Sequence, residues 1–313
     1  MRVFVAGATG AIGKQLVPRL VAAGHEVYGM TRSESKQGML SQLGAVPVVA
    51  DALDPDQVAE AVGKAMPDVI VHQLTAIGLL DMRHFDRSFA PTNRLRTEST
   101  DYLLSAGQAV GVRRVVAQSY FAAYAREGGP VKSEEDPLDR SPTRQMRGTM
   151  AAIRHLEEAV LGARWTEGIV LRYGAFYGPG DEGLTRAVRK RQTPLVGDGR
   201  GVMSFVHLDD AAAATVLALD YAGPAVFNIV DDEPAPMGDW LPVLAQAVGA
   251  KPPRHVPIWI ARLIAGPGLT MLTEARGSSN AKARRQLNWQ PRYPSWRQGF
   301  AAAYGEHSSR ASR

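Results

Sequence analysis

The stretch Gly7-Ala8-Thr9-Gly10-Ala11-Ile12-Gly13 follows an apolar run over residues 3–6 and opens a segment with apolar residues at helical spacing. Its glycines stand where a buried strand would turn sharply into a helix. Gly7 permits the tight turn, Gly10 lets the backbone approach a phosphate closely, and Gly13 lets the helix pack against the strand. The helix N-terminus then faces negative charge. The stretch therefore predicts a dinucleotide pyrophosphate site, with contacts from Gly7, Thr9, Gly10, Ala11, Ile12 and Gly13.

Short apolar runs alternate with helix-like stretches through the first half of the chain, which is the pattern of a parallel sheet covered on both faces. The runs expected to be strands are residues 2–6, 25–30, 46–49, 68–72, 114–117 and 168–171. Beyond them the chain becomes rich in Gly and Pro, which indicates loops. The pattern predicts an α/β fold: a Rossmann-type doubly wound parallel sheet with a smaller, interleaved C-terminal substrate region.

The expected division of the chain into domains follows from this change in amino-acid composition. Residues 1–175 are predicted to form the dinucleotide-binding domain, and residues 202–230 to return to it. Residues 176–201 and 231–313 are predicted to form the substrate-binding region.

Composition narrows the possible chemistry and partners. The 313 residues include no cysteine, which excludes disulfides, thiolate metal sites and a cysteine nucleophile. The net charge of +5 divides into +7 on residues 276–313 and −2 on the rest. Trp289 and Trp296 in that basic segment favour a folded unit with solvated charges over a nucleic-acid tail. With no apolar stretch suited to a membrane or signal peptide, a cytoplasmic protein is expected.

The residue after the second predicted strand indicates which dinucleotide binds. NAD-binding proteins usually carry a carboxylate there to hold the ribose hydroxyls. This chain has Thr31-Arg32-Ser33 instead. A guanidinium at Arg32 suits a 2′-phosphate, so NADP(H) is favoured over NAD, although Arg32 as a plain surface charge stays an alternative.

The motifs together resemble the extended short-chain dehydrogenase/reductases, the group of NAD(P)-dependent epimerases and dehydratases. The resemblance covers nearly the whole chain and includes Val48–Asp54, Val69–Thr75, Leu171–Gly180, Ser204–Asp210 and Phe227–Val230. It implies that Asp51 meets the adenine amine. It also implies cofactor contacts from Ala52, Leu74, Thr75 and Tyr173, and pairing of two chains through helices of the cofactor domain, hence a possible homodimer.

The catalytic positions depart from this family's pattern. The family carries Tyr-x-x-x-Lys on one helix, where the lysine lowers the pKa of a tyrosine that exchanges a proton with the substrate. Aligned on Glu158, this chain has Met150 at the tyrosine position and Arg154 at the lysine position. Methionine has no proton to give. Arg154 keeps its charge and can still bind the cofactor's ribose, or it is an exposed helix charge.

Tyr120 is the first substitute predicted for the missing acid, because it stands at the end of the fifth predicted strand. Ser119 lies one residue earlier, near the family's usual Ser or Thr. A packed aromatic residue is an equally good interpretation of Tyr120. His72 and His207 are expected to satisfy backbone groups near strand ends, and no spacing of histidines and carboxylates indicates a metal site.

The predicted function is an NADP(H)-dependent oxidoreductase of atypical type that acts on a small organic substrate. Ser119, Tyr120 and Arg154 are its predicted catalytic residues. Substrates that are easily reduced, such as quinone-like carbonyls, would need less help from an acid. Two alternatives stay open: an NADP(H)-binding protein without redox turnover, and an isomerase or lyase that uses the cofactor as a scaffold.

Overall fold

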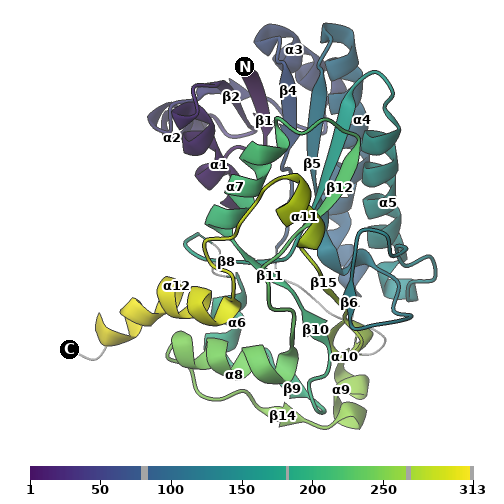
Figure 1. Ribbon diagram of the computed structural model, residues 1–313, viewed down its shortest axis with the longest axis vertical. Helices are drawn as coiled ribbons and strands as arrows, with labels where there is room; N and C mark the ends of the chain where they lie inside the picture. The colour runs from purple at the N-terminus through teal and green to yellow at the C-terminus, as the bar shows by residue number, and fades with distance from the viewer. Residues whose placement is uncertain (79–83, 181–182, 266–268, 311–313) are drawn as a thin grey trace.

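Seven strands pair in parallel to form the central sheet of the computed structural model, which describes residues 1–78, 84–180, 183–265 and 269–310 (Figure 1). The predicted doubly wound Rossmann-type sheet is confirmed. Its strands in spatial order are β12 (Ala225–Ile229), β7 (Glu167–Tyr173), β5 (Arg114–Tyr120), β4 (Val69–His72), β1 (Arg2–Ala6), β2 (Glu26–Thr31) and β3 (Val46–Val49).

Two layers of helices cover the sheet because alternate residues of each strand are apolar toward opposite faces. Val3 and Val5 of β1 point into one core, while Phe4 and Ala6 point into the other. The first core contains α1 (Ala11–Ala22), α2 (Gln37–Gln42), α7 (Leu208–Ala218) and α11 (Ala281–Gln286). The second contains α3 (Pro55–Ala65), α4 (Phe85–Val110) and α5 (Arg147–Gly162).

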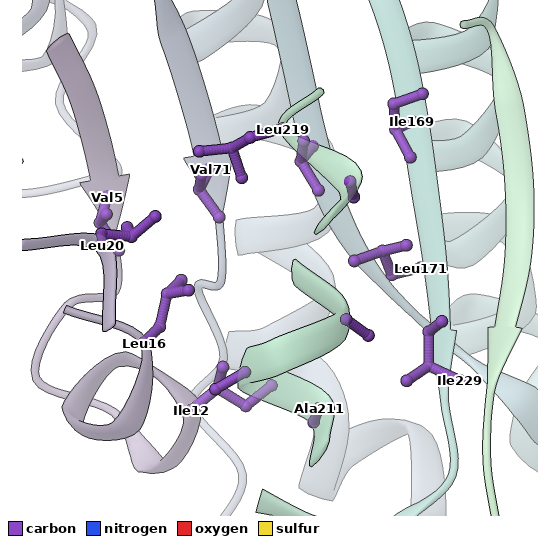
Figure 2. Close-up of a cluster of buried hydrophobic side chains, with 14 of the residues drawn as sticks. Val5, Ile12, Leu16, Leu20, Val71, Ile169, Leu171, Ala211, Leu219 and Ile229 are labelled. Carbon is purple, nitrogen blue, oxygen red and sulfur yellow. The ribbon is translucent and has the colours of Figure 1, made fainter. Parts of the chain in front are cut away.

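Figure 2 shows the first of these cores at the level of the glycine turn. Ile12 and Leu16 of α1 lie toward the sheet beside Ala211 of α7, and Leu171 and Ile229 face them from the strands. Helices α1 and α7 pack directly against each other. The two helices that begin at the carboxyl edge of the sheet are therefore held in one rigid core.

The second region lies beyond the carboxyl ends of the strands (Figure 1). Its short strand pairs are β8 (Ala175–Tyr177) with β11 (Phe205–His207), β10 (Val202–Met203) with β13 (Ala235–Pro236), β9 (Leu195–Val196) with β14 (His255–Val256), and β6 (Val131–Lys132) with β15 (Gly277–Ser278). Its helices are α6 (Gly183–Arg189), α8 (Met237–Ala247), α9 (Ile258–Ala265), α10 (Thr270–Thr273) and α12 (Trp296–Arg310). Three short 3-10 turns complete the described elements: η1 (Glu34–Lys36), η3 (Phe121–Ala123) and η4 (Arg144–Met146).

The basic C-terminal segment is folded, as the sequence predicts. Trp289 is buried in the core between the sheet and α7, and its indole Nε1 donates to the Asp210 carbonyl at 3.2 Å. Trp296 and Phe300 are fully buried in the core of the second region. The division of the chain into two parts stays a prediction, and residues 311–313 of its last part lie outside the described residues.

The described helices include none that is both long and apolar enough to cross a membrane.

Two helical glycines give opposite predictions for stability. An alanine methyl at Gly13 would meet the backbone of Ala8 and Gly7, whereas one at Gly63 in α3 would meet nothing within 4 Å. We expect Gly13→Ala to lower the free energy of unfolding by about 1–3 kcal/mol through overpacking. Gly63→Ala should raise it by about 0.5–1 kcal/mol, because alanine loses less backbone entropy on folding. Urea unfolding of both variants measures the difference, and equal effects would contradict the close packing of α1 on the turn.

Candidate functional site

The glycine turn after β1 has the geometry that a pyrophosphate requires. Gly7 has a φ of +92°, and a Cβ there would lie 2.6 Å from the Gln73 carbonyl oxygen at the end of β4. Gly10 precedes α1 without a side-chain cap, and the first turn of α1 carries no acidic residue. The N-terminal N–H groups of α1 are thus available to an anion, and the helix dipole favours one. A dinucleotide fits this turn, and its nicotinamide supplies or accepts hydride when bound.

The other predicted cofactor residues follow the carboxyl ends of neighbouring strands. Arg32 and Asp51 are exposed after β2 and β3, and the Asp51 carboxylate accepts from the Leu53 N–H at 3.0 Å. Leu74 and Thr75 follow β4, where Thr75 is exposed. The predicted contacts therefore lie along one edge of the sheet, which is where doubly wound folds bind ligands.

Ala52 lies beside this edge and forms a hydrogen bond to helix α4. It is buried, and its carbonyl accepts a hydrogen bond from the Ser99 hydroxyl of α4 at 2.6 Å. This bond fixes the loop after β3 against α4.

A buried ion pair connects α5 with the middle of the sheet. Glu157 of α5 and Arg172 of β7 are 3% and 5% exposed. The Arg172 Nε and Nη2 donate to the two Glu157 carboxylate oxygens at 2.9 and 2.5 Å. Burial works to lower the pKa of Arg172, but the Glu157 carboxylate outweighs it and holds that pKa above its usual value.

Ser119 belongs to this buried ion pair. Its hydroxyl donates to Glu157 Oε1 at 2.6 Å, and the residue is 4% exposed. On the other side, Arg172 Nη1 donates to the Tyr124 hydroxyl at 2.8 Å, and that hydroxyl donates to Asn228 Oδ1 at 2.7 Å. The network joins β5, α5, β7 and β12 below the carboxyl edge of the sheet.

Arg154 and Tyr173 have partners that the sequence did not indicate. Arg154 Nη1 donates to the Asp139 carbonyl at 2.7 Å. The Tyr173 hydroxyl lies 2.7 Å from Thr215 Oγ1 of α7 and accepts from Gln73 Nε2 at 3.2 Å. Burial raises the pKa of Tyr173 to about 12, so this phenol is protonated at neutral pH.

Tyr120 ends β5 and is half-buried. Its ring packs against an apolar cluster that includes Met150 and Ile153 of α5. Burial raises the pKa of Tyr120, and the nearby Arg96 guanidinium acts in the opposite direction. The balance keeps Tyr120 protonated at neutral pH, as a proton donor must be.

The two histidines near strand ends accept hydrogen bonds from backbone N–H groups, as the sequence predicts. His72 Nδ1 accepts from the Leu74 N–H at 3.3 Å, and His207 Nδ1 accepts from the Asp209 N–H at 3.1 Å. Across the part of the chain that the structure describes, no three His, Asp or Glu side chains are grouped as metal ligands.

The sequence does not predict a functional role for three charged residues of this site: Arg96, Glu157 and Arg172. Arg172 and Tyr173 are residues of strand β7, which extends two residues beyond the strand predicted over residues 168–171. The sequence around Arg96 does not indicate a buried residue, because Arg94 and Glu98 are charged neighbours on both sides. Its spacing from Thr92 and Thr100, which are both buried, is the signal that would have placed it on the inner face of α4.

Comparison with known proteins defines the class. The model of the NAD dependent epimerase/dehydratase family matches residues 3–229, and the chain belongs to this family. It is similar to the 3-diazoavenalumate denitrifying reductase of a Streptomyces species, with 44% identity over 307 residues that cover 96% of this chain and 99% of that protein. More distant relatives, 27–28% identical, are reductases and a UDP-glucose 4-epimerase.

Solved structures agree on the fold. UDP-glucose 4-epimerase from Thermotoga maritima superposes with a TM-score of 0.79 at 19% identity, with full coverage of both chains. A human epimerase family protein with bound NADPH superposes with a TM-score of 0.75 at 22% identity, covering 99% of each chain. The protein is an NAD(P)-dependent oxidoreductase of the short-chain dehydrogenase/reductase type.

The buried ion pair predicts a large loss of stability when one partner is removed. Arg172→Met leaves the Glu157 carboxylate buried without its cation, and we expect the free energy of unfolding to fall by about 3–5 kcal/mol. Chemical denaturation measures this loss. Arg94→Met is the matched control, because it removes an exposed pair with Glu98 on α4 and should cost about 0.5 kcal/mol or less.

The double variant Glu157→Gln/Arg172→Met separates the charge effect from the loss of packing. We expect it to be more stable than Arg172→Met alone, because no unpaired carboxylate remains in the core. A double variant that is less stable than either single variant would contradict this origin of the effect.

Proposed function

We propose that the protein is an NADP(H)-dependent reductase of small organic electrophiles whose reduction needs no acid from helix α5. The observation that carries the proposal is the presence of Met150, which has no acidic proton, at the position predicted for the family's catalytic tyrosine. It is 2% exposed and lies in the apolar cluster against which Tyr120 packs, where the family resemblance predicts a tyrosine. Arg154, at the predicted lysine position, is held by the Asp139 carbonyl. Neither side chain supplies a proton.

An aryl diazonium group is the electrophile that this site suits best. Reduction of a ketone creates an alkoxide that must be protonated, whereas hydride added to the outer nitrogen of a diazonium cation only neutralises its charge. The resulting diazene, Ar–N=N–H, then loses N2. Its C–N bond breaks with the electron pair left on the ring carbon, its N–H bond breaks, and that proton passes to the same carbon, so the diazonium cation and one hydride yield the arene and N2. The 44% identity to a 3-diazoavenalumate denitrifying reductase over almost the full length of both proteins supports this substrate class.

Tyr120 is the proton donor that we propose for substrates that do form an oxyanion, such as quinones. Its position at the end of β5 and its protonated state support this role. Ser119, engaged by Glu157, and Arg154, engaged by Asp139, are proposed to position the sheet edge and α5. Tyr173, bonded to Thr215, is proposed to support the cofactor from within the core.

Tyr120→Phe distinguishes the two kinds of substrate. We expect this variant to reduce a quinone about 100-fold more slowly or worse, because general acid catalysis is lost. Its reduction of an aryl diazonium salt should stay within about 3-fold of wild type, since that hydride transfer needs no proton. Loss of NADPH absorbance and release of the arene measure the two rates.

Met150→Ala is the control for this comparison and should leave the ratio of the two rates unchanged. An equal loss of both activities in Tyr120→Phe would contradict the proposed division of roles. A wild-type protein that binds NADPH but oxidises it with neither substrate would overturn the reductase proposal itself.

Arg32 is the residue that we propose selects NADP(H). It is exposed directly after β2, and the residues from Thr31 to Ser33 include no carboxylate to repel a 2′-phosphate. Arg32→Ala should weaken NADPH binding about 10- to 100-fold, the value of a charge-assisted hydrogen bond, and leave NADH binding unchanged. Lys36→Ala removes a cation from η1, four residues further along the chain, and serves as the control. Wild-type protein that binds both cofactors equally would contradict the assignment.

We further propose a cytoplasmic homodimer that takes no nucleic-acid partner. The family resemblance supports pairing through helices of the cofactor domain. Ion pairs of the C-terminal arginines with the chain's own carboxylates, such as Arg284–Asp232 and Arg297–Glu233, support a basic segment that serves the fold.

A further inference from the structure

Arg96 is a buried cation at the carboxyl edge of the sheet. It lies on α4 one turn after Thr92 and one turn before Thr100, so the three side chains share the inner face of the helix. Thr92 Oγ1 accepts from the Ala76 N–H at 3.0 Å, and Thr100 Oγ1 lies 3.1 Å from His72 Nε2. These two contacts place Arg96 at the level where β4 ends and the loop after it begins.

Among the described residues, no carboxylate forms an ion pair with the buried guanidinium of Arg96. The residue is 5% exposed, and within the described part of the chain its Nη1 has no hydrogen-bond partner. Glu157 interacts with it electrostatically, but both oxygens of that carboxylate are already bonded to Arg172. Two buried guanidinium groups, Arg96 and Arg172, therefore interact with a single carboxylate, Glu157.

Neutralisation by proton loss does not remove this excess charge. Burial lowers the pKa of Arg96 to about 10, which still leaves the group charged at neutral pH. His72 does not add to the charge, because burial lowers its pKa to about 4 and keeps the ring neutral. A structural arginine in such a place is normally paired, so the missing anion points to a ligand.

Tyr120 marks the side from which that ligand would come. Arg96 and Tyr120 are close enough to interact electrostatically, and Tyr120 ends β5, the strand beside β4. Figure 1 shows that the carboxyl ends of β4 and β5 face the second region, and doubly wound folds bind their ligands at this edge. A guanidinium offers a planar pair of donors, which matches the oxygens of an organic anion better than a halide or a neutral carbonyl.

We propose that Arg96 is a specificity-determining residue that binds an organic oxyanion, a carboxylate or a phenolate, on the substrate. This inference deepens the proposed function, since it names the class of substrate that the same site accepts, and it rests on that function. A substrate with an oxyanion would supply the charge that the buried network lacks.

The test measures binding without turnover. The probe is 4-nitrophenol, whose absorbance distinguishes the phenol from the phenolate, added to the full-length protein saturated with NADP+. We expect wild type to bind the phenolate and to lower the pKa of the bound probe by about one unit or more, as a neighbouring cation does. Arg96→Leu should abolish that shift and weaken phenolate binding at least about 10-fold, the scale of a charge-assisted hydrogen bond.

Competition distinguishes the two possible sources of the oxyanion. Cinnamate displaces the probe if the site takes carboxylates, and its uncharged amide should compete at least about 10-fold less well. If cinnamate does not compete while phenolate binds, the ligand group is a phenolate alone. Arg96→Lys should retain part of the preference for the anion.

Arg94→Leu is the matched control, because it removes an exposed arginine two residues away on the same helix. Three outcomes would overturn the proposal: no preference for the anion in wild type, a preference that survives Arg96→Leu, or an equal loss in Arg94→Leu. If Arg96→Leu binds NADP+ more weakly but still prefers the anion, Arg96 is a cofactor-binding residue. That result would overturn the proposal as well. Failure to reduce a diazonium salt or a quinone would count against the proposed function and leave these binding results unaffected.

Discussion

The buried pair of Glu157 and Arg172 is the constraint on which the site depends. A carboxylate and a guanidinium at this depth are stable only when each satisfies the other, since an unpaired buried ion costs several kcal/mol. The pair fixes α5 against β7, and the Ser119 hydroxyl extends it to β5. The carboxyl edge of the sheet is thus held rigid by charge rather than by apolar packing alone.

This constraint divides the polar groups of the edge into two sets. Ser119 and Tyr124 donate their hydroxyls to the network, so their hydrogen atoms are committed within the protein. Arg96 and Tyr120 stand beside the network without being bonded into it. We therefore assign the proposed chemistry on a substrate to the second set, because only groups that are not already hydrogen-bonded in the network can bind a ligand without breaking the core.

Local patterns in the sequence were enough to predict the sheet and the glycine turn. They did not predict the long-range hydrogen-bond partners of the site residues. Strands β1 to β5 and the turn at Gly7 follow from apolar runs and glycine spacing, which act within a few residues. The partners of Ser119, Arg154 and Tyr173 lie 15 to 100 positions away, so no periodicity identifies them. Arg96 shows the same limit: its neighbours Arg94 and Glu98 form an exposed pair, which makes the segment look solvated throughout.

The excess positive charge also restricts which electrophile the site can hold. A diazonium group is itself a cation, and a buried guanidinium repels it strongly where the dielectric constant is low. This repulsion is removed when the substrate places an oxyanion between the two positive charges. A zwitterion meets that condition, since its anion pairs with Arg96 while its cationic nitrogen accepts hydride. After reduction the nitrogen is gone and the product is a plain anion, which Arg96 continues to hold. The pairing with Arg96 thus contributes to the binding of substrate and product alike, because the reduction leaves the oxyanion unchanged.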